Sequence, residues 1–367
     1  MKTTLYNLLF LIVLSPALLF SNNVDPKSLN GKYTKEKKIS KQFTVDANTL
    51  MKISNSYGNI DVSTWDQNTI KIEVFIKTNG NDEEKVIKKL NDINIKFNQS
   101  SSEVSARTEF PKSNNNSFWD LLFGESSNVN MEVNYVIKAP VNNNLDLNND
   151  YGNIFIDKLN GNSKINCDYG RIDIGELNGD SNYLYFDYSR NSHFGTINKA
   201  IINSDYSEFT IENARSLDIN ADYSTSVIRK VELLQFNCDY GSLTVDKVRK
   251  LLGSADYLST KIGQVHQSLD LNVDYGSVSI DKIMKSAGDI TIASDYAGVK
   301  IGYATDYAFD FAVNTSYGSV SGMDNFDIRK QNKSSNEKNY SGYHLSSSNK
   351  SNIRINSSYA NINFRQQ

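Results

Sequence analysis

The sequence contains little proline, little histidine and no excess of basic charge. Four prolines in 367 residues, together with abundant asparagine, serine, tyrosine and isoleucine, favour β-strands joined by polar turns. The net charge of −3 argues against a nucleic-acid-binding surface, which needs a basic excess. The three histidines are scattered, and the sequence has no phosphate loop, no Gly-x-Ser-x-Gly motif and no cysteine-nucleophile motif. We therefore predict no enzyme, no catalytic residues and no nucleic-acid partner.

Apolar residues are also slightly scarce, at 39% of the chain. One large compact core is therefore not expected, whereas a thin core along one axis needs fewer apolar residues per repeat. At the N-terminus, Lys2 precedes an apolar run from Leu5 to Phe20, and small residues follow near Ser21. The run is short for a membrane anchor, which is the alternative. We predict that residues 1–22 are a cleaved signal peptide, so that the mature chain is exported and keeps no stable membrane span.

A tyrosine-centred repeat organises most of the chain, with 17 to 21 residues between successive tyrosines in the array. Apolar and polar residues alternate on both sides of each tyrosine, often around Asn-x-Asp-Tyr-Gly. This alternation predicts two half-buried strands per repeat, joined at a bend where the glycine supplies positive φ. The repeat tyrosines are Tyr57, Tyr151, Tyr169, Tyr188, Tyr206, Tyr223, Tyr240, Tyr257, Tyr275, Tyr296, Tyr317 and Tyr359.

The repeat length decides the expected fold class. About eighteen residues are too few for a helix-containing unit, but they suit one coil that pairs with the coils above and below it. We predict an all-β parallel β-solenoid, or β-helix, with right-handed coils of 17–21 residues over residues 141–322. Residues 323–350 are polar and are expected to form a mobile loop. Residues 351–367 should form a final coil that closes that end.

The N-terminal part departs from the repeat. Residues 33–140 contain strand-like runs at Ile70–Thr78 and Val129–Ala139 and one charged helix candidate, Asp82–Leu90. We predict that this region is the first coil plus an N-terminal cap, which would cover an edge that otherwise invites aggregation.

The two cysteines occupy the same place in their repeats. Cys167 and Cys238 lie four repeats apart, so a strand spacing of about 4.8 Å separates them by on the order of 19 Å. A disulfide needs Cα atoms within roughly 7 Å. We therefore predict two free, buried thiols.

The repeat resembles a known group of bacterial exported proteins, the putative-adhesin family, some of which are auto-transporter adhesin head domains. The resemblance rests on Ser54–Val62 (SNSYGNIDV), on the run Tyr135–Pro140 that leads into the array, and on the repeated Asp-Tyr-Gly. It covers nearly all of the mature chain. It implies a β-helix-like fold with no assigned chemistry, and it implies no functional residues.

Two polar columns are the first candidate site. By alternation, the aspartate before each tyrosine and the asparagine two residues earlier should lie on the outer face. Carboxylates one strand spacing apart repel by roughly 1 kcal/mol even in water. Either these side chains bond the turn backbone, or they bind a row of cations, with calcium as the possible cofactor and Asp205, Asp222 and Asp239 as candidate ligands. The columns are Asp150, Asp168, Asp187, Asp205, Asp222, Asp239, Asp256, Asp274 and Asp295, and Asn148, Asn166, Asn203, Asn220, Asn237 and Asn272.

The tyrosine column is the second candidate. Each tyrosine lies an even number of residues after a buried position, which predicts an inward-facing, buried ladder with hydroxyls at the edge. The alternative is that the glycine bend turns the rings outward, as a platform for sugar rings.

An apolar run in a polar loop is the third candidate. It comprises Phe118, Trp119, Leu121, Leu122 and Phe123. If exposed, it would dock a partner or a membrane; if folded back, it would be a lid of the cap.

Two functions from different classes remain. The first is a non-catalytic exported β-solenoid: an adhesin or a binding or structural module of the cell envelope. It would lie in the periplasm, on the cell surface or in the medium, with a surface protein or a polysaccharide as its partner. The alternative is a β-helix carbohydrate-active enzyme, a polysaccharide lyase or hydrolase, that uses an aspartate pair. Because the aspartates recur on nearly every coil while a catalytic site is unique, we favour the first.

Overall fold

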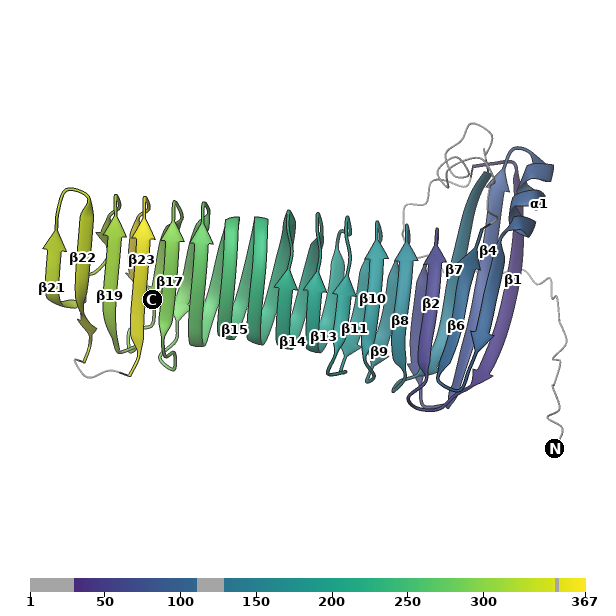
Figure 1. The fold of residues 1–367 in the computed structure, drawn as a ribbon, viewed down its shortest axis with the longest axis horizontal. Coiled ribbons are helices and arrows are strands. Elements are labelled where there is room, and N and C mark those ends of the chain that lie inside the picture. The colour runs from purple at the N-terminus through teal and green to yellow at the C-terminus, as the bar shows by residue number, and fades with distance from the viewer. Residues whose placement is uncertain (1–29, 111–128, 347–349) are drawn as a thin grey trace.

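The computed structural model describes residues 30–110, 129–346 and 350–367. The predicted signal peptide, residues 1–22, lies outside them. Within the described residues the chain forms twenty-four strands and one helix, which confirms the all-β prediction. Figure 1 shows the strands side by side along one long axis, with the helix near one end and a pair of strands at the other.

Each repeat of the array contributes a leading strand before its tyrosine and a trailing strand after it. Leading strands pair with leading strands, and trailing strands with trailing strands, in parallel and in register. The elements of the array are β8 (Asn144–Asp150), β9 (Ile154–Leu159), β10 (Ser163–Asp168), β11 (Ile172–Leu177), β12 (Asn182–Tyr185), β13 (Ser192–Asn203), β14 (Glu208–Asn220), β15 (Ser224–Asp274), β16 (Ser277–Ile283), β17 (Ile290–Asp295) and β18 (Gly298–Tyr303).

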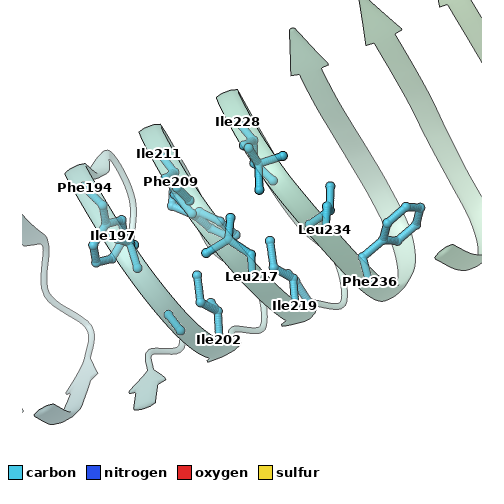
Figure 2. Close-up of a cluster of buried hydrophobic side chains, with 14 of the residues drawn as sticks. Phe194, Ile197, Ile202, Phe209, Ile211, Leu217, Ile219, Ile228, Leu234 and Phe236 are labelled. Carbon is cyan, nitrogen blue, oxygen red and sulfur yellow. The ribbon is translucent and has the colours of Figure 1, made fainter. Parts of the chain in front are cut away.

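The core is a thin apolar layer between leading and trailing strands. Figure 2 shows Ile202, Ile219 and Phe236 from three successive leading strands, together with Phe209 and Ile211 from a trailing strand. All five are at most 2% exposed. Each contributes roughly 1.5–3 kcal/mol through burial, but only because the neighbouring repeats cover it.

The N-terminal end is built by strands that pair out of sequence order. The two strands on either side of Tyr57 pair with the first repeat of the array on one side. On their other side they pair with two strands that come later in the chain, at residues 103–109 and 129–140. Antiparallel strands and the helix lie beyond these two strands. These elements are β1 (Tyr33–Thr44), β2 (Leu50–Ser56), β3 (Ile60–Trp65), β4 (Thr69–Gly80), α1 (Glu83–Asp92), β5 (Asn94–Gln99), β6 (Glu103–Glu109) and β7 (Val129–Pro140).

The predicted helix and strands of this end are confirmed. The Asp82 side chain accepts a hydrogen bond from the backbone N–H of Lys85 at 3.2 Å and caps α1. Val86 is buried, and its carbonyl oxygen accepts a hydrogen bond from the Thr78 hydroxyl of β4 at 3.0 Å. The helix is thereby fixed to the strand beside it.

The C-terminal repeat does not close the stack. Its leading strand β23 (Asn352–Ser358) lies between β17 and β19 (Phe309–Ser316), with parallel pairing on both sides. Its trailing strand β24 (Ile362–Gln366) lies between β18 and β20 (Val320–Ser321). Figure 1 shows β23, in yellow, between β17 and β19. The prediction that residues 351–367 close the end is wrong, because strand pairing rather than chain order decides the position of a repeat.

Residues 323–350 also differ from the prediction of a mobile polar loop. They contain β21 (Asp327–Lys333) and β22 (Glu337–His344), an antiparallel hairpin that pairs with β19 through β22. All seven residues of β21 are exposed. The segment is polar because β21 is an edge strand, and charged side chains on an edge strand discourage pairing with other chains. Phe326, just before β21, is buried and packs against Phe364 at 5.1 Å.

Candidate binding face

The repeat tyrosine itself makes the bend between leading and trailing strands. All twelve tyrosines have φ between 49° and 66°, a left-handed conformation that costs a non-glycine residue roughly 1–2 kcal/mol. The backbone N–H of Tyr206 donates to the carbonyl oxygen of Asp222 in the next repeat at 3.0 Å, and the same bond recurs along the stack. Hydrogen bonds between neighbouring repeats thus hold the tyrosine in this strained bend, the left-handed corner of each repeat.

The glycine after the tyrosine has a different role from the predicted one. Positive φ occurs at Gly241 but not at Gly170, for example. A Cβ at Gly170 would lie 1.9 Å from the carbonyl oxygen of Gly152, so this glycine permits close approach of two repeats. The prediction that glycine supplies positive φ at each bend is therefore wrong, because the tyrosine has already turned the chain.

The tyrosines form one continuous ladder on the outside of the molecule. Successive ring centroids lie 4.6–5.3 Å apart with interplanar angles of 1–9°. Ten of the twelve side chains are 41–57% exposed. The stacking prediction is confirmed, whereas the prediction of a buried ladder is wrong, since the left-handed corner ends the in–out alternation on which it relied.

The ladder presents ring edges and hydroxyls rather than ring faces. Each inner ring is covered on both faces by its neighbours. At one end Phe110 packs edge-on to Tyr57 at 6.1 Å, and at the other the Asn336 amide donates to the Tyr317 hydroxyl at 3.3 Å. The geometry therefore offers no broad aromatic plane on which a sugar ring could lie along the ladder.

The aspartate column bonds the backbone of the next repeat. The N–H of Asp205 donates to Oδ1 of Asp187 at 2.9 Å, and the N–H of Asp222 donates to Oδ1 of Asp205 at 3.2 Å. The N–H of Asp239 donates to Oδ1 of Asp222 at 3.0 Å. These N–H groups offset part of the carboxylate repulsion and support the backbone-bonding explanation. In the described ranges, no three His, Cys, Asp or Glu side chains are grouped to hold a metal ion.

Three carboxyl groups of this column have raised pKa values. Burial raises the pKa of Asp150, and the Asp168 carboxylate adds to this rise. Burial likewise raises the pKa of Asp187, although the backbone N–H of Asp205 acts against it. Burial also raises the pKa of Asp256, and the neighbouring carboxylates of Asp239 and Asp274 raise it further. Ionisation of Asp150, Asp187 and Asp256 is therefore less favourable than that of a free aspartate in water.

A shallow hollow lies over the asparagine and aspartate columns. Its volume is about 350 Å³, and it crosses the leading strands of five successive repeats. Tyr185 stands in the asparagine column, beside Asn166 and Asn203 in the register. The repeat pattern does not predict Tyr185 as part of this face, although its departure from the repeat consensus is a usable signal. The hollow is lined by Asn148, Asn166, Tyr185, Asn203 and Asn220 from one column and by Asp168, Asp187 and Asp205 from the other.

A larger hollow, about 710 Å³, lies further along the leading strands. Leu233 and Leu252 are 41% and 50% exposed within it, and Asp218 and Asp270 line it too. Single exposed leucines carry no periodic signal, so the sequence pattern did not identify this hollow.

The remaining candidates do not come together. Phe118, Trp119, Leu121, Leu122 and Phe123 lie outside the described residues. The histidines at 193 and 344 stand on β13 and β22, in separate parts of the stack. His266 stands on β15, so the three histidines do not come together. His193 lies beside two carboxylates, 3.7 Å from Asp173 and 3.5 Å from Glu212.

The free-thiol prediction is confirmed for Cys167 and Cys238, which are both free and buried. Burial raises the pKa of Cys238 to about 12, so this thiol stays protonated.

No helix in the described part of the chain is long and apolar enough to cross a membrane. No known family and no curated protein matches the sequence.

Similar solved structures come from bacteria. The chain is similar to a putative cell adhesion protein from Clostridium sporogenes ATCC 15579, with 12% identity over 91% of this chain and 100% of the other and a TM-score of 0.18. It is similar to a putative adhesin from Parabacteroides merdae ATCC 43184, with 8% identity over 90% and 96% and a TM-score of 0.36. It is also similar to a putative adhesin from Parabacteroides distasonis ATCC 8503, with 13% identity over 74% and 92% and a TM-score of 0.31.

Proposed function

We propose that this chain is an exported, non-catalytic binding module: a parallel β-solenoid that attaches to a linear polysaccharide of a cell surface or envelope. In-register parallel pairing of successive repeats supports the solenoid. The strong preference for right-handed crossovers between parallel strands favours right-handed coils. The ligand would lie along the outer face of the leading strands.

One observation carries the proposal: from Asp150 to Asp295 a carboxylate recurs in every repeat and an amide in most repeats on one outer face, and a hollow crosses five repeats there. Amides donate and accept, and carboxylates accept, the hydrogen bonds that sugar hydroxyls offer. A surface that repeats along one axis matches a ligand that repeats along its own axis. Many weak contacts of one kind then add up along the chain.

The enzyme alternative needs a different arrangement. A glycosidase uses two carboxyl groups whose environments differ, so that one is protonated and the other is charged. In this column, Asp205, Asp222 and Asp239 have the same bond to the next backbone N–H. Equivalence of this kind favours a binding surface over a catalytic pair.

Binding of the mature chain to a panel of soluble and insoluble polysaccharides, including native envelope material, tests the proposal. We expect the variant N166A/Y185A/N203A to bind at least about tenfold more weakly, because about 1 kcal/mol is lost for each hydrogen bond removed. The matched control is N213A/K261A, which changes two exposed residues of the trailing strands. Equal binding by both variants would place the ligand elsewhere, and absence of binding to every polysaccharide would reject the ligand class.

A further inference from the structure

The tyrosine ladder has a chemical property that polysaccharide binding does not use. Twelve of the 21 tyrosines of the chain lie in one stack, with centroids 4.6–5.3 Å apart. Because ten of them are 41–57% exposed, small oxidants in the solvent reach the phenol edges. Phenols are oxidised by one electron to phenoxyl radicals, and two adjacent radicals couple.

We propose that the ladder is a site of oxidative cross-linking, at which neighbouring tyrosines are coupled to dityrosine by a peroxide-dependent one-electron oxidant. Two phenols each lose one electron and one proton, which together reduce one hydrogen peroxide to two water molecules. The two radicals form one carbon–carbon bond between the ring positions ortho to the hydroxyls. The hydrogen on each of these carbons then moves to oxygen and restores both phenols.

Proximity in the folded chain favours coupling within the ladder. Backbone bonds such as Tyr223 N–H to the Asp239 carbonyl, 2.9 Å, fix the two strands at stacking distance. The rings of Tyr223 and Tyr240 are 4.8 Å apart and 1° from parallel. Coupling requires the two ortho carbons to close this gap, which a change in the side-chain torsions at Cα–Cβ and Cβ–Cγ would allow, because the rings are about half exposed. A radical formed on any ring therefore has a neighbouring phenol at this distance, and a second one-electron oxidation converts that phenol into the radical with which it couples.

The C-terminal repeat provides a specific signature. Tyr359 stacks on Tyr296 at 4.6 Å and on Tyr317 at 4.8 Å, so it separates two tyrosines that are successive in the sequence pattern. Coupling of Tyr359 in the folded protein must therefore be to Tyr296 or to Tyr317. A direct link between Tyr296 and Tyr317 is excluded by the intervening ring. Such links would tie the C-terminal repeat covalently to the repeats on either side of it.

Dilute mature protein treated with a haem peroxidase and hydrogen peroxide tests the proposal. Tyr296, Tyr359 and Tyr317 fall in three different tryptic peptides, because Lys or Arg stands between them. We expect dityrosine fluorescence from the monomer, and linked peptides that contain Tyr296–Tyr359 and Tyr317–Tyr359, each lighter by two hydrogen atoms than the sum of its parts. The linked protein should melt at a higher temperature.

Two variants separate the ladder from other tyrosines. Y359F keeps a ring in the stack but should remove both links of the C-terminal repeat, while links such as Tyr223–Tyr240 persist. Y183F removes an exposed phenol outside the ladder and should leave the yield unchanged. The proposal is overturned by absence of dityrosine in the monomer, by Tyr296–Tyr317 links, or by the same link pattern in chemically unfolded protein.

Discussion

The ring of Phe236 fills the space that a side chain at Gly253 of the neighbouring repeat would occupy. A Cβ at Gly253 would lie 2.2 Å from Cε1 of Phe236. Both residues stand four positions before a repeat tyrosine, where other repeats place residues such as Ile219 and Leu271. The extra volume of one repeat is thus compensated by the next, and the thin core keeps its packing density.

This pair yields a packing prediction. G253A should lower the free energy of unfolding by about 1–3 kcal/mol, because the methyl group overlaps a buried ring. Chemical denaturation measures the loss. G298A is the control, since a Cβ at Gly298 meets no atom within 4 Å. Adding F236L to G253A should recover most of the stability, and a purely additive double mutant would contradict the coupling.

The left-handed corner makes glycine the better replacement for a ladder tyrosine. Y206A and Y206G both lose the ring, but alanine keeps the cost of positive φ at this position. We expect Y206G to be more stable than Y206A by about 1 kcal/mol, after allowance for the greater entropy of unfolded glycine. At Tyr183, which lies within β12, the order should reverse. A Y206A variant at least as stable as Y206G would show that the corner is not strained.

The aspartate column should not depend on calcium. In D205N/D222N/D239N the amide oxygen can still accept the N–H bond of the next repeat, while the repulsion disappears. We expect unchanged or higher thermal stability, and a calcium response no larger than that of magnesium at matched ionic strength. A calcium-specific rise in Tm that the triple substitution abolishes would establish the cation row instead.

The contribution of three aspartates of the column to stability should become more favourable as the pH falls from neutral toward the acid range. Burial raises the folded-state pKa of Asp150, Asp187 and Asp256, so the stabilising neutral form is lost as the pH rises through that pKa. D150N/D187N/D256N should therefore exceed the wild type in free energy of unfolding at about pH 7, and the difference should shrink toward about pH 4. Denaturation at several pH values measures it, and a difference independent of pH would contradict the assignment.

Removal of residues 351–367 should open a gap within the stack rather than shorten its end. Ile353, Ile355, Ile362 and Phe364 are buried between the repeats on either side, and their loss costs at least several kcal/mol. Hydrogen exchange should show loss of protection in β19. A peptide with the sequence of residues 351–367 should restore it, whereas an I355D peptide should not. Unchanged protection in the truncated chain would contradict the inserted position.

Much of the architecture was predictable from local pattern. Alternation around Leu147, Ile165 and Ile202 reports which side chains face inward, because a strand has a period of two residues. The constant spacing then requires neighbouring repeats to pair, since one repeat cannot bury its own apolar face. The same logic placed the aspartate and asparagine columns outside and kept Cys167 and Cys238 apart.

The candidate face was predictable only in part. The sequence identified the aspartate and asparagine columns, but it did not show that Tyr185 interrupts one of them inside a hollow. It also placed the ladder on the wrong side. The φ of Tyr206 is set by hydrogen bonds to the next repeat, and these bonds depend on residues that are distant from it in the sequence.

By itself, the sequence determined the repeat, the inward side chains and the unpaired cysteines, because each follows from periodicity within one strand. Only the tertiary structure decided which repeat lies beside which. The residues of β23 and β2 match the repeat as well as any others, yet both strands lie between neighbours that are distant in the chain. Because all repeats offer the same strand edges for pairing, the local sequence of a repeat does not determine its neighbours. Their order is selected by the sum of the contacts that each repeat makes with the repeats on both sides of it.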